Sequence, residues 1–295
     1  MGMHRLNYMV RTVSDAEGAR EFYRVFGLSE TSSGAFNSKV GGTQLVLRES
    51  SSPTVVSIGV GVDARSDLDD IEARLREQEF AFERRSPEAL FVDDPATDVR
   101  IELTVSPRLP KETPAPAGIR PRRDDLVPRN GVRPIRLGHV VLGCPDEKEA
   151  ERFFIKGLGL RLSDYVHGNP FMRFETDHHN IAVIRTPRGR LLHHTAWKVR
   201  NVDEVGFGGS EMVRRDPACY GWGLGRHAAS ANYFWYLKDP GGAYAEYYHS
   251  EMDELADTPE YWDRLPGTPE LPSAVWASPP YESPLRPEIP LAAVG

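Results

Sequence analysis

The sequence predicts an α+β protein with two tandem modules joined by an extended connection, and three observations favour this organisation. An internal repeat relates the two halves, each copy contains strand-like and helix-like patterns, and a polar stretch rich in proline lies between the copies. The length of 295 residues is enough for either two domains or one large one.

The internal repeat is visible when the apolar segment 6–10 is laid on segment 137–141. Each copy is expected to begin with this strand and to continue with a helix that starts near an aspartate and ends near a Gly-Leu pair. The further matches are Asp15 with Asp146, Phe22-Tyr23 with Phe153-Phe154 and, after a gap of one residue, Gly27-Leu28 with Gly159-Leu160.

Further strands are expected in both copies from apolar and alternating patterns. In the first copy they cover 42–48, 55–62, 89–92 and 99–105, with a helix over 67–77 whose apolar face holds Leu68, Ile71 and Leu75. In the second copy they cover 171–176, 181–185, 193–199, 233–237 and 243–248.

Four segments follow from these patterns. They are an N-terminal module over 1–105, a linker over 106–134, a C-terminal module over 135–250, and a proline-rich tail over 251–295. The linker and the tail beyond about residue 266 carry no apolar period, which favours an extended or irregular chain.

Composition excludes several classes of function. A net charge of -7 without a long Lys/Arg block argues against nucleic acid and anionic membranes as partners, and a small ligand is expected instead. The two cysteines, Cys144 and Cys219, form no CxxC motif, so neither a disulfide framework nor a thiolate zinc site is predicted. With no apolar stretch long enough to span a membrane and no leader pattern, a cytoplasmic protein is expected.

Three residues of the C-terminal module form a candidate metal-ligand set. Two imidazoles and one carboxylate on one face of an iron leave positions open for an organic substrate and O2. His139 lies in an apolar strand, His194 opens another, and Glu246 follows the turn 239–242 in a third. His193 is the second choice for the second imidazole.

The repeat distinguishes these histidines from ordinary core residues. In the N-terminal copy, Tyr8 occupies the place of His139, Ser57 that of His194, and Glu102 roughly that of Glu246. If the fold itself required both imidazoles, the first copy would need them too. The asymmetry predicts one functional site per chain, in the second module.

A longer motif connects these residues to a known family. Gly225-Arg226-His227 is followed nine residues later by Tyr236, then by Asp239-Pro240-Gly241-Gly242 and Glu246. With this spacing, the Leu-Gly-His context of His139 and the His193-His194 pair, the sequence resembles the type I extradiol dioxygenases of the vicinal oxygen chelate superfamily over about residues 6–248. Trp235 departs from the family pattern, which is expected to affect the shape of the pocket.

The resemblance implies a fold of paired βαβββ repeats, with the metal site in the C-terminal module. It implies Fe(II), or alternatively Mn(II), at His139, His194 and Glu246, and cleavage of a catechol-type diol by O2 next to its two hydroxyls. His179 then matches an acid–base histidine, with His178 as its alternative, while His227 and Tyr236 match residues that hydrogen-bond the diol. An oligomer of identical chains is also implied. The rest of the substrate is expected to lie against aromatic residues, for which Phe171, Trp197, Tyr220, Trp222 and Trp235 are available.

Two other classes of function stay open. One is a binding protein of the same superfamily that sequesters small molecules without a metal. The other is a different metal enzyme of that superfamily, such as a glyoxalase-like lyase, an epimerase or a 2-oxoacid-dependent hydroxylase. The complete His, His, Glu set argues against the first. Within the second, Tyr8 and Ser57 argue against a glyoxalase-like site built from paired modules, and the spacing from His227 to Tyr236 argues against a hydroxylase.

Overall fold

The structure is a computed structural model that describes residues 2–110, 131–187, 189–255 and 258–280. Most of the expected linker, 111–130, and the end of the expected tail, 281–295, lie outside the described residues. No helix among the described residues is both long and apolar enough to cross a membrane.

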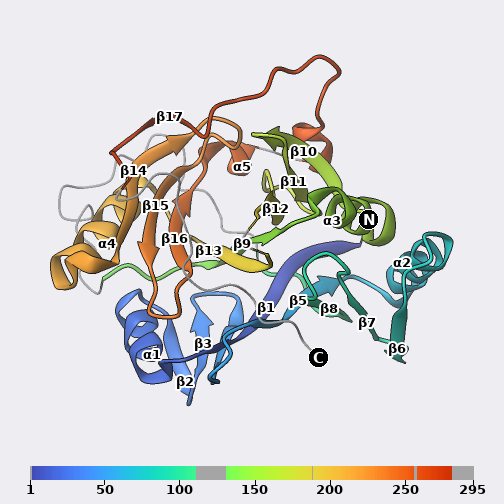
Figure 1. The fold of residues 1–295 in the computed structure, drawn as a ribbon, viewed down its shortest axis with the longest axis horizontal. Coiled ribbons are helices and arrows are strands. Elements are labelled where there is room, and N and C mark those ends of the chain that lie inside the picture. The colour runs from blue at the N-terminus through green and yellow to red at the C-terminus, as the bar shows by residue number, and fades with distance from the viewer. Residues whose placement is uncertain (1, 111–130, 188, 256–257, 281–295) are drawn as a thin grey trace.

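The first half of the chain forms one mixed sheet from two consecutive βαβββ units (Figure 1). The first unit contains β1 (Met3–Val13), α1 (Ala16–Val25), β2 (Ser29–Ser32), β3 (Ala35–Ser38) and β4 (Gly42–Glu49). The second contains β5 (Val55–Val62), α2 (Arg65–Glu77), β6 (Phe82–Ser86), β7 (Ala89–Asp93) and β8 (Arg100–Val105).

The second half repeats this plan. Its first unit contains β9 (Arg136–Cys144), α3 (Glu147–Arg152) extended by a π-helical turn (Phe153–Leu158), β10 (Arg161–Val166), β11 (Asn169–Arg173) and β12 (Ile181–Arg185). Its second contains β13 (Leu191–Lys198), α4 (Val202–Arg215), a 3-10 turn (Pro217–Cys219), β14 (Tyr220–His227), β15 (Tyr233–Lys238) and β16 (Tyr244–His249). After α5 (Glu251–Leu255) and a 3-10 turn (Pro259–Trp262), β17 (Ala274–Ala277) joins the edge of this sheet.

Both sheets have the same strand order, which confirms the predicted fold class. In the first, β1 and β5 pair antiparallel at the centre, and each pairs in parallel with the last strand of its own unit, β4 or β8. In the second, β9 and β13 are central and pair in parallel with β12 and β16. At one edge of the second sheet β14 is followed by β17, which is added to the strand order that the two sheets share.

The predicted strands lie close to the observed ones, with three kinds of difference. The patterns missed four short strands, β2, β3, β6 and β10, and they also missed β14 and α4. The expected strand 171–176 is too late, because β11 ends at Arg173 and residues 174–180 form an irregular loop. The segment expected as an extended tail contributes β17 to the sheet.

One continuous apolar core runs through both modules. Phe26, at the end of α1, stacks on Tyr247 of β16 with ring centroids 3.9 Å apart. The Tyr247 hydroxyl also donates to the Phe26 carbonyl at 2.7 Å. This buried apolar contact couples the two modules. It holds β16, the strand that carries Glu246, against the N-terminal module.

Candidate metal centre and its cavity

His139, His194 and Glu246 project from three neighbouring strands, β9, β13 and β16. Register explains their meeting, because Ala196 of β13 lies beside both His139 and Glu246, and side chains in register point to one face of a sheet. One ligand atom from each of the three residues lies within 4.8 Å of the other two. Oε2 of Glu246 is 3.2 Å from Nε2 of His139 and 3.3 Å from Nε2 of His194.

The three residues fit a divalent cation. All three are buried, and Nε2 of His194, although close to Glu246, forms no well-aligned hydrogen bond with a described residue, an arrangement that is costly unless another ligand is bound there. Burial alone would raise the pKa of Glu246, but its contacts with the two imidazoles outweigh this and hold its pKa well below the usual value. Burial lowers the pKa of His194 to about 4. The carboxylate is therefore ionised and this imidazole neutral at neutral pH, as metal ligands require.

Packing around His139 explains the Leu-Gly-His pattern. A Cβ atom on Gly138 would collide with the Tyr248 hydroxyl, so a larger residue cannot stand before the histidine without displacing Tyr248. Tyr248 itself packs against the His139 ring at 5.0 Å and donates to Asp177 at 3.0 Å. Its ring helps to fix the orientation of His139.

The N-terminal module carries the same three positions without the imidazoles. Tyr8 of β1, Gly59 of β5 and Glu102 of β8 lie side by side in the register that His139, Ala196 and Glu246 share in the second module. The Tyr8 hydroxyl donates to Glu102 at 2.6 Å, and the Tyr8 ring covers Gly59. Ser57 takes the place of His194, as the repeat predicts.

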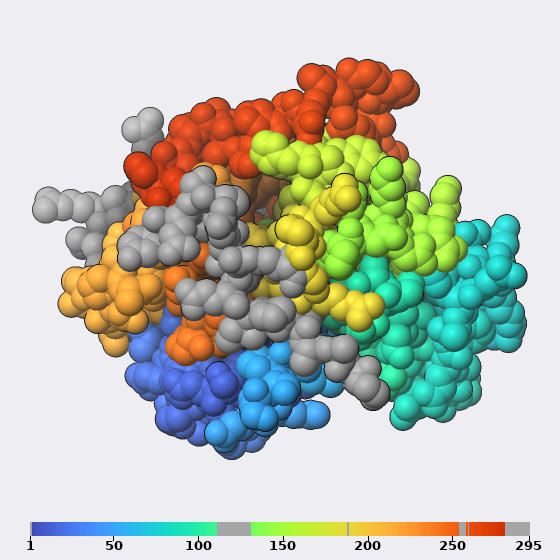
Figure 2. All heavy atoms as spheres, in the orientation of Figure 1, coloured from blue at the N-terminus to red at the C-terminus, as the bar shows by residue number. Residues whose placement is uncertain are grey.

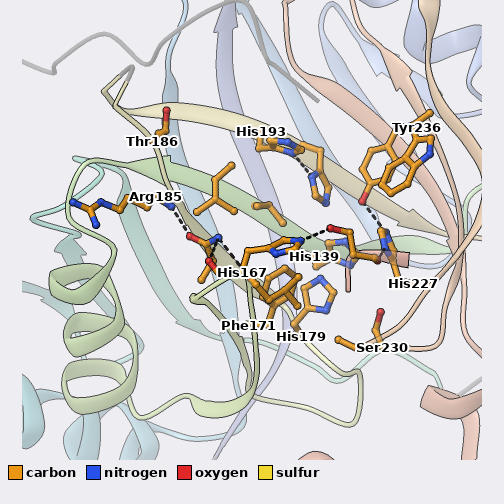
Figure 3. Close-up of a pocket in the computed structure, with 18 of the residues that line it drawn as sticks. His139, His167, Phe171, His179, Arg185, Thr186, His193, His227, Ser230 and Tyr236 are labelled. Carbon is orange, nitrogen blue, oxygen red and sulfur yellow. Dashed lines mark hydrogen bonds between the residues drawn. The ribbon is translucent and has the colours of Figure 1, made fainter. Parts of the chain in front are cut away.

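His139 and His194 line a cavity of about 720 Å³ (Figure 3). Six histidines line it, among them His227 at the end of β14, and Tyr236 of β15 lies beside them. Nε2 of His227 is 3.0 Å from the Tyr236 hydroxyl, and its Nδ1 is 2.7 Å from the Ser273 carbonyl. A carbonyl only accepts, so Nδ1 carries the proton and Nε2 accepts from Tyr236.

His179 lines the cavity from the loop before β12, and its ring centroid is 4.1 Å from that of His139. His178 lies behind it and does not line the cavity; the two Nδ1 atoms are 3.1 Å apart. Burial is the main cause that lowers the pKa of both, to about 3 for His178 and well below the usual value for His179. Because the contact with His178 uses Nδ1 of His179, Nε2 is the nitrogen of His179 that is available to the cavity.

Two groups beside these residues were not predicted. The Asn232 amide approaches Oε1 of Glu246 at 3.4 Å, and the Ser273 carbonyl orients His227. The sequence does not indicate either group. Every residue has a backbone carbonyl, so the role of the one at Ser273 cannot be predicted, and Asn232 lies in an ordinary polar loop.

Of the five aromatic residues available for a substrate pocket, Phe171 and Trp222 line the cavity and the other three do not. The expectation that Trp235 shapes the pocket is wrong. Its indole packs over Gly209 of α4 and Gly223 of β14, where an added Cβ would collide with it.

Sequence comparison finds relatives over part of the chain. Metapyrocatechase 2 of Cupriavidus necator is 42% identical over 119 residues, which cover 39% of this chain and 37% of that protein. Biphenyl-2,3-diol 1,2-dioxygenase of Paraburkholderia xenovorans is 30% identical over 120 residues, 38% of this chain and 40% of that protein. The matched regions thus span about two fifths of these relatives' length. No protein-family model matches the chain.

Solved structures match almost the whole chain. A halotolerant catechol dioxygenase, BphC, superimposes with a TM-score of 0.76 at 17% identity, covering 97% of both chains. The chain has the vicinal oxygen chelate fold of the extradiol dioxygenases. A Mn(II)-bound glyoxalase from Novosphingobium aromaticivorans also matches, with a TM-score of 0.68 at 22% identity over 92% of this chain and 93% of that one. The fold alone therefore does not choose between these two activities.

Proposed function

We propose that the chain is an extradiol dioxygenase, which opens the ring of a catechol-type diol with O2 next to its two hydroxyls and forms a muconic semialdehyde-type product. The observation that carries the proposal is the convergence of His139, His194 and Glu246 at a cavity that the two histidines line together with a hydrogen-bonded His227–Tyr236 pair. The names of the curated relatives support the same activity.

His139, His194 and Glu246 would hold the metal, which we propose to be Fe(II). A bound iron would offer adjacent coordination positions to the diol and O2 and carry electrons between them. Mn(II) fits the same donor set, and one relative is named a manganese-dependent dioxygenase and another an iron-dependent one.

Tyr236 and His227 would remove a proton from the diol. Because the Tyr236 hydroxyl donates its own proton to Nε2 of His227, its oxygen is free to accept from a diol hydroxyl in the cavity. The diol proton then goes to Tyr236 while the tyrosine proton moves to Nε2 of His227. Glu246, whose Oε1 lies 3.9 Å from that nitrogen, favours the resulting positive charge.

His179 would act as the acid–base group on the other side of His139. Its Nε2 is available to the cavity, and burial keeps the imidazole neutral at neutral pH, so Nε2 either donates its proton or accepts one, according to the tautomer. The overall reaction balances without another reductant, because both oxygen atoms of O2 end in the product and the ring carbons supply the electrons.

A different metal enzyme is the second candidate, favoured by the structural likeness to a glyoxalase. Against it, the N-terminal module offers Tyr8 and Ser57 where a second set of imidazoles would stand.

We also propose a homo-oligomer in the cytoplasm; light scattering of the purified protein tests the assembly.

Oxygen uptake tests the proposal. Protein loaded with Fe(II) under anaerobic conditions and then mixed with a vicinal diol and ¹⁸O₂ is expected to consume one O2 per diol. The product is expected to be yellow and to contain both labelled atoms. Absence of uptake with every diol, together with tight diol binding, would favour a binding protein, whereas turnover of a glutathione hemithioacetal would favour a lyase.

A further inference from the structure

The cavity extends well beyond the metal-ligand residues. It follows β9 from His139 toward Cys144, where Ile184 of β12 lies beside Gly143 and the Thr186 amide donates to the Cys144 carbonyl. At a rise of about 3.3 Å per residue, Gly143 lies roughly 13 Å along the strand from His139. In Figure 3, Thr186 and Arg185 lie at one end of the cavity, and His227 and Tyr236 at the other.

We call the end away from the metal-ligand residues the distal chamber. Its wall comes from the β10–β11 hairpin, the end of β12 and the start of β13. The described side chains that line it are Val166, Asn169, Ile184, Thr186, Pro187 and Leu191.

The wall of the distal chamber is apolar because its polar groups are already used. Asn169 accepts from the Arg185 amide at 2.6 Å and donates to the Val166 carbonyl at 3.1 Å. His167, at the tip of the hairpin, is 2.8 Å from the Ser273 hydroxyl. These contacts hold the hairpin against β12 and the C-terminal segment, and they leave mainly aliphatic surface toward the cavity. Figure 2 shows that segment, in red, beside the yellow-green β10–β11 region.

The described residues of the distal chamber also include no buried positive charge. Among the described residues that line the cavity, Arg185 is the single Lys or Arg. Its side chain is 73% exposed and lies 3.7 Å from Glu147, and Figure 3 shows it directed away from the ligand residues. A carboxylate placed in the chamber would lose its water without gaining a buried partner, which is costly.

We propose that the distal chamber binds an uncharged, apolar ring substituent, so that the preferred substrate is an aryl-substituted or bicyclic vicinal diol. The inference rests on the proposed extradiol activity and deepens it. A cavity of about 720 Å³ is in the range that encloses drug-sized ligands, and a single six-membered ring at the metal-ligand residues fills a minor part of it. A second ring reaches the aliphatic wall, whereas a carboxylate there gains no partner.

The test compares kcat/KM for catechol, 2,3-dihydroxybiphenyl and 3,4-dihydroxybenzoate. We expect the aryl-substituted diol to be favoured over catechol by about tenfold or more, the effect of filling an apolar pocket. The carboxylate is expected to be the poorest of the three. A preference for catechol or the carboxylate would overturn the inference while leaving the proposed activity intact. No cleavage of any diol would instead remove the proposed activity itself.

Ile184→Phe tests the location of the subsite, because its ring would fill the distal chamber. We expect the ratio of kcat/KM for the aryl diol to that for catechol to fall about tenfold. Arg185→Gln, at the next position, is the matched control because it removes the charge without filling the chamber. We expect it to change kcat/KM for the aryl diol and for the carboxylate, each relative to catechol, by no more than about twofold. Val166→Leu narrows the chamber from the hairpin side and serves if Ile184→Phe lowers the melting temperature. An unchanged ratio in folded Ile184→Phe or Val166→Leu protein, or loss of carboxylate turnover in Arg185→Gln, would contradict the assignment.

Discussion

Arg11 of the N-terminal module forms a buried ion pair with Asp239, the residue that opens the turn before β16 in the C-terminal module. Nη1 of Arg11 lies 2.7 Å from Oδ2 of Asp239, and the two side chains are 4% and 1% exposed. The Tyr23 hydroxyl donates to the same oxygen at 2.8 Å, and Arg11 also donates to the Gly241 carbonyl at 3.1 Å. By itself the Asp-Pro-Gly-Gly motif indicates only a hairpin turn, yet here it docks the strand of Glu246 onto the other module.

Arg11→Met is expected to lower the free energy of unfolding by about 3–5 kcal/mol, because it leaves the Asp239 carboxylate buried without its charged partner. Urea unfolding measures the change. Arg65→Met is the matched control, since Arg65 pairs with Glu88 on the surface, where both side chains are more than half exposed. Its cost is expected to stay below about 1 kcal/mol. Equal costs for the two variants would show that the buried pair does not couple the modules.

The contribution of Asp94 to the free energy of unfolding is expected to fall as the pH rises from about 4 to about 6, whereas the buried histidines with lowered pKa values act in the opposite direction. Burial raises the pKa of Asp94 to about 6, against the opposing hydrogen bonds from Thr97 and Ala96. Between the unfolded pKa of about 3.9 and this value the native state binds more protons, so raising the pH favours unfolding. The loss is on the order of 1–3 kcal/mol and is complete above the native pKa.

Asp94→Asn tests this because it removes the titration, while its amide oxygen can still accept from the Ala96 amide and its NH2 group can donate to the Thr97 hydroxyl. The variant is expected to gain stability relative to the wild type between pH 4 and pH 8, measured by urea unfolding at both values. Asp93→Asn, at the neighbouring exposed position, is the control and is expected to show no such gain. Parallel profiles for Asp94→Asn and the wild type would contradict the assignment.

Removal of the Tyr236 hydroxyl is expected to lower kcat by about 10²-fold, as for loss of a positioned proton acceptor. Tyr244→Phe is the matched control. Tyr244 is buried in the same aromatic cluster, 6.4 Å from the Tyr236 ring, but does not line the cavity. The rate of formation of the yellow product measures both, with metal content checked in each. Equal rates for Tyr236→Phe and the wild type would remove Tyr236 from the proton path.

The repeat made the three candidate ligand residues and their shared location predictable. Aligning Tyr8 with His139 identified the equivalent positions Ser57 and Glu102, and the strand registers place them as expected. The choice of His194 over His193 followed from laying segment 194–197 on segment 139–142, and the ligand atoms of His139, His194 and Glu246 do converge. Periodicity and repeat signals are strong where a strand is central and buried on both faces.

Other features were not predictable, for physical reasons. Residues 174–176 mix apolar and polar side chains and were predicted as the end of a strand. In the structure the Asn180 side chain accepts from the Phe174 amide, which favours the irregular loop 174–180. The Asp239–Arg11 pair joins residues 228 positions apart, which local patterns do not encode. Asp253 has acidic neighbours in the sequence, yet it is buried and accepts from the His178 amide at 3.1 Å.

Metal content is the most direct test of the central claim, that His139, His194 and Glu246 bind one cation. Protein purified without oxygen, loaded with Fe(II) and dialysed is expected to retain one metal per chain, and His139→Ala, His194→Ala and Glu246→Ala are each expected to lose most of it. His193→Ala, and Glu102→Ala at the equivalent position of the first module, are expected to keep it. Retention of metal by any of the three ligand variants, or its absence from the wild type, would contradict the account.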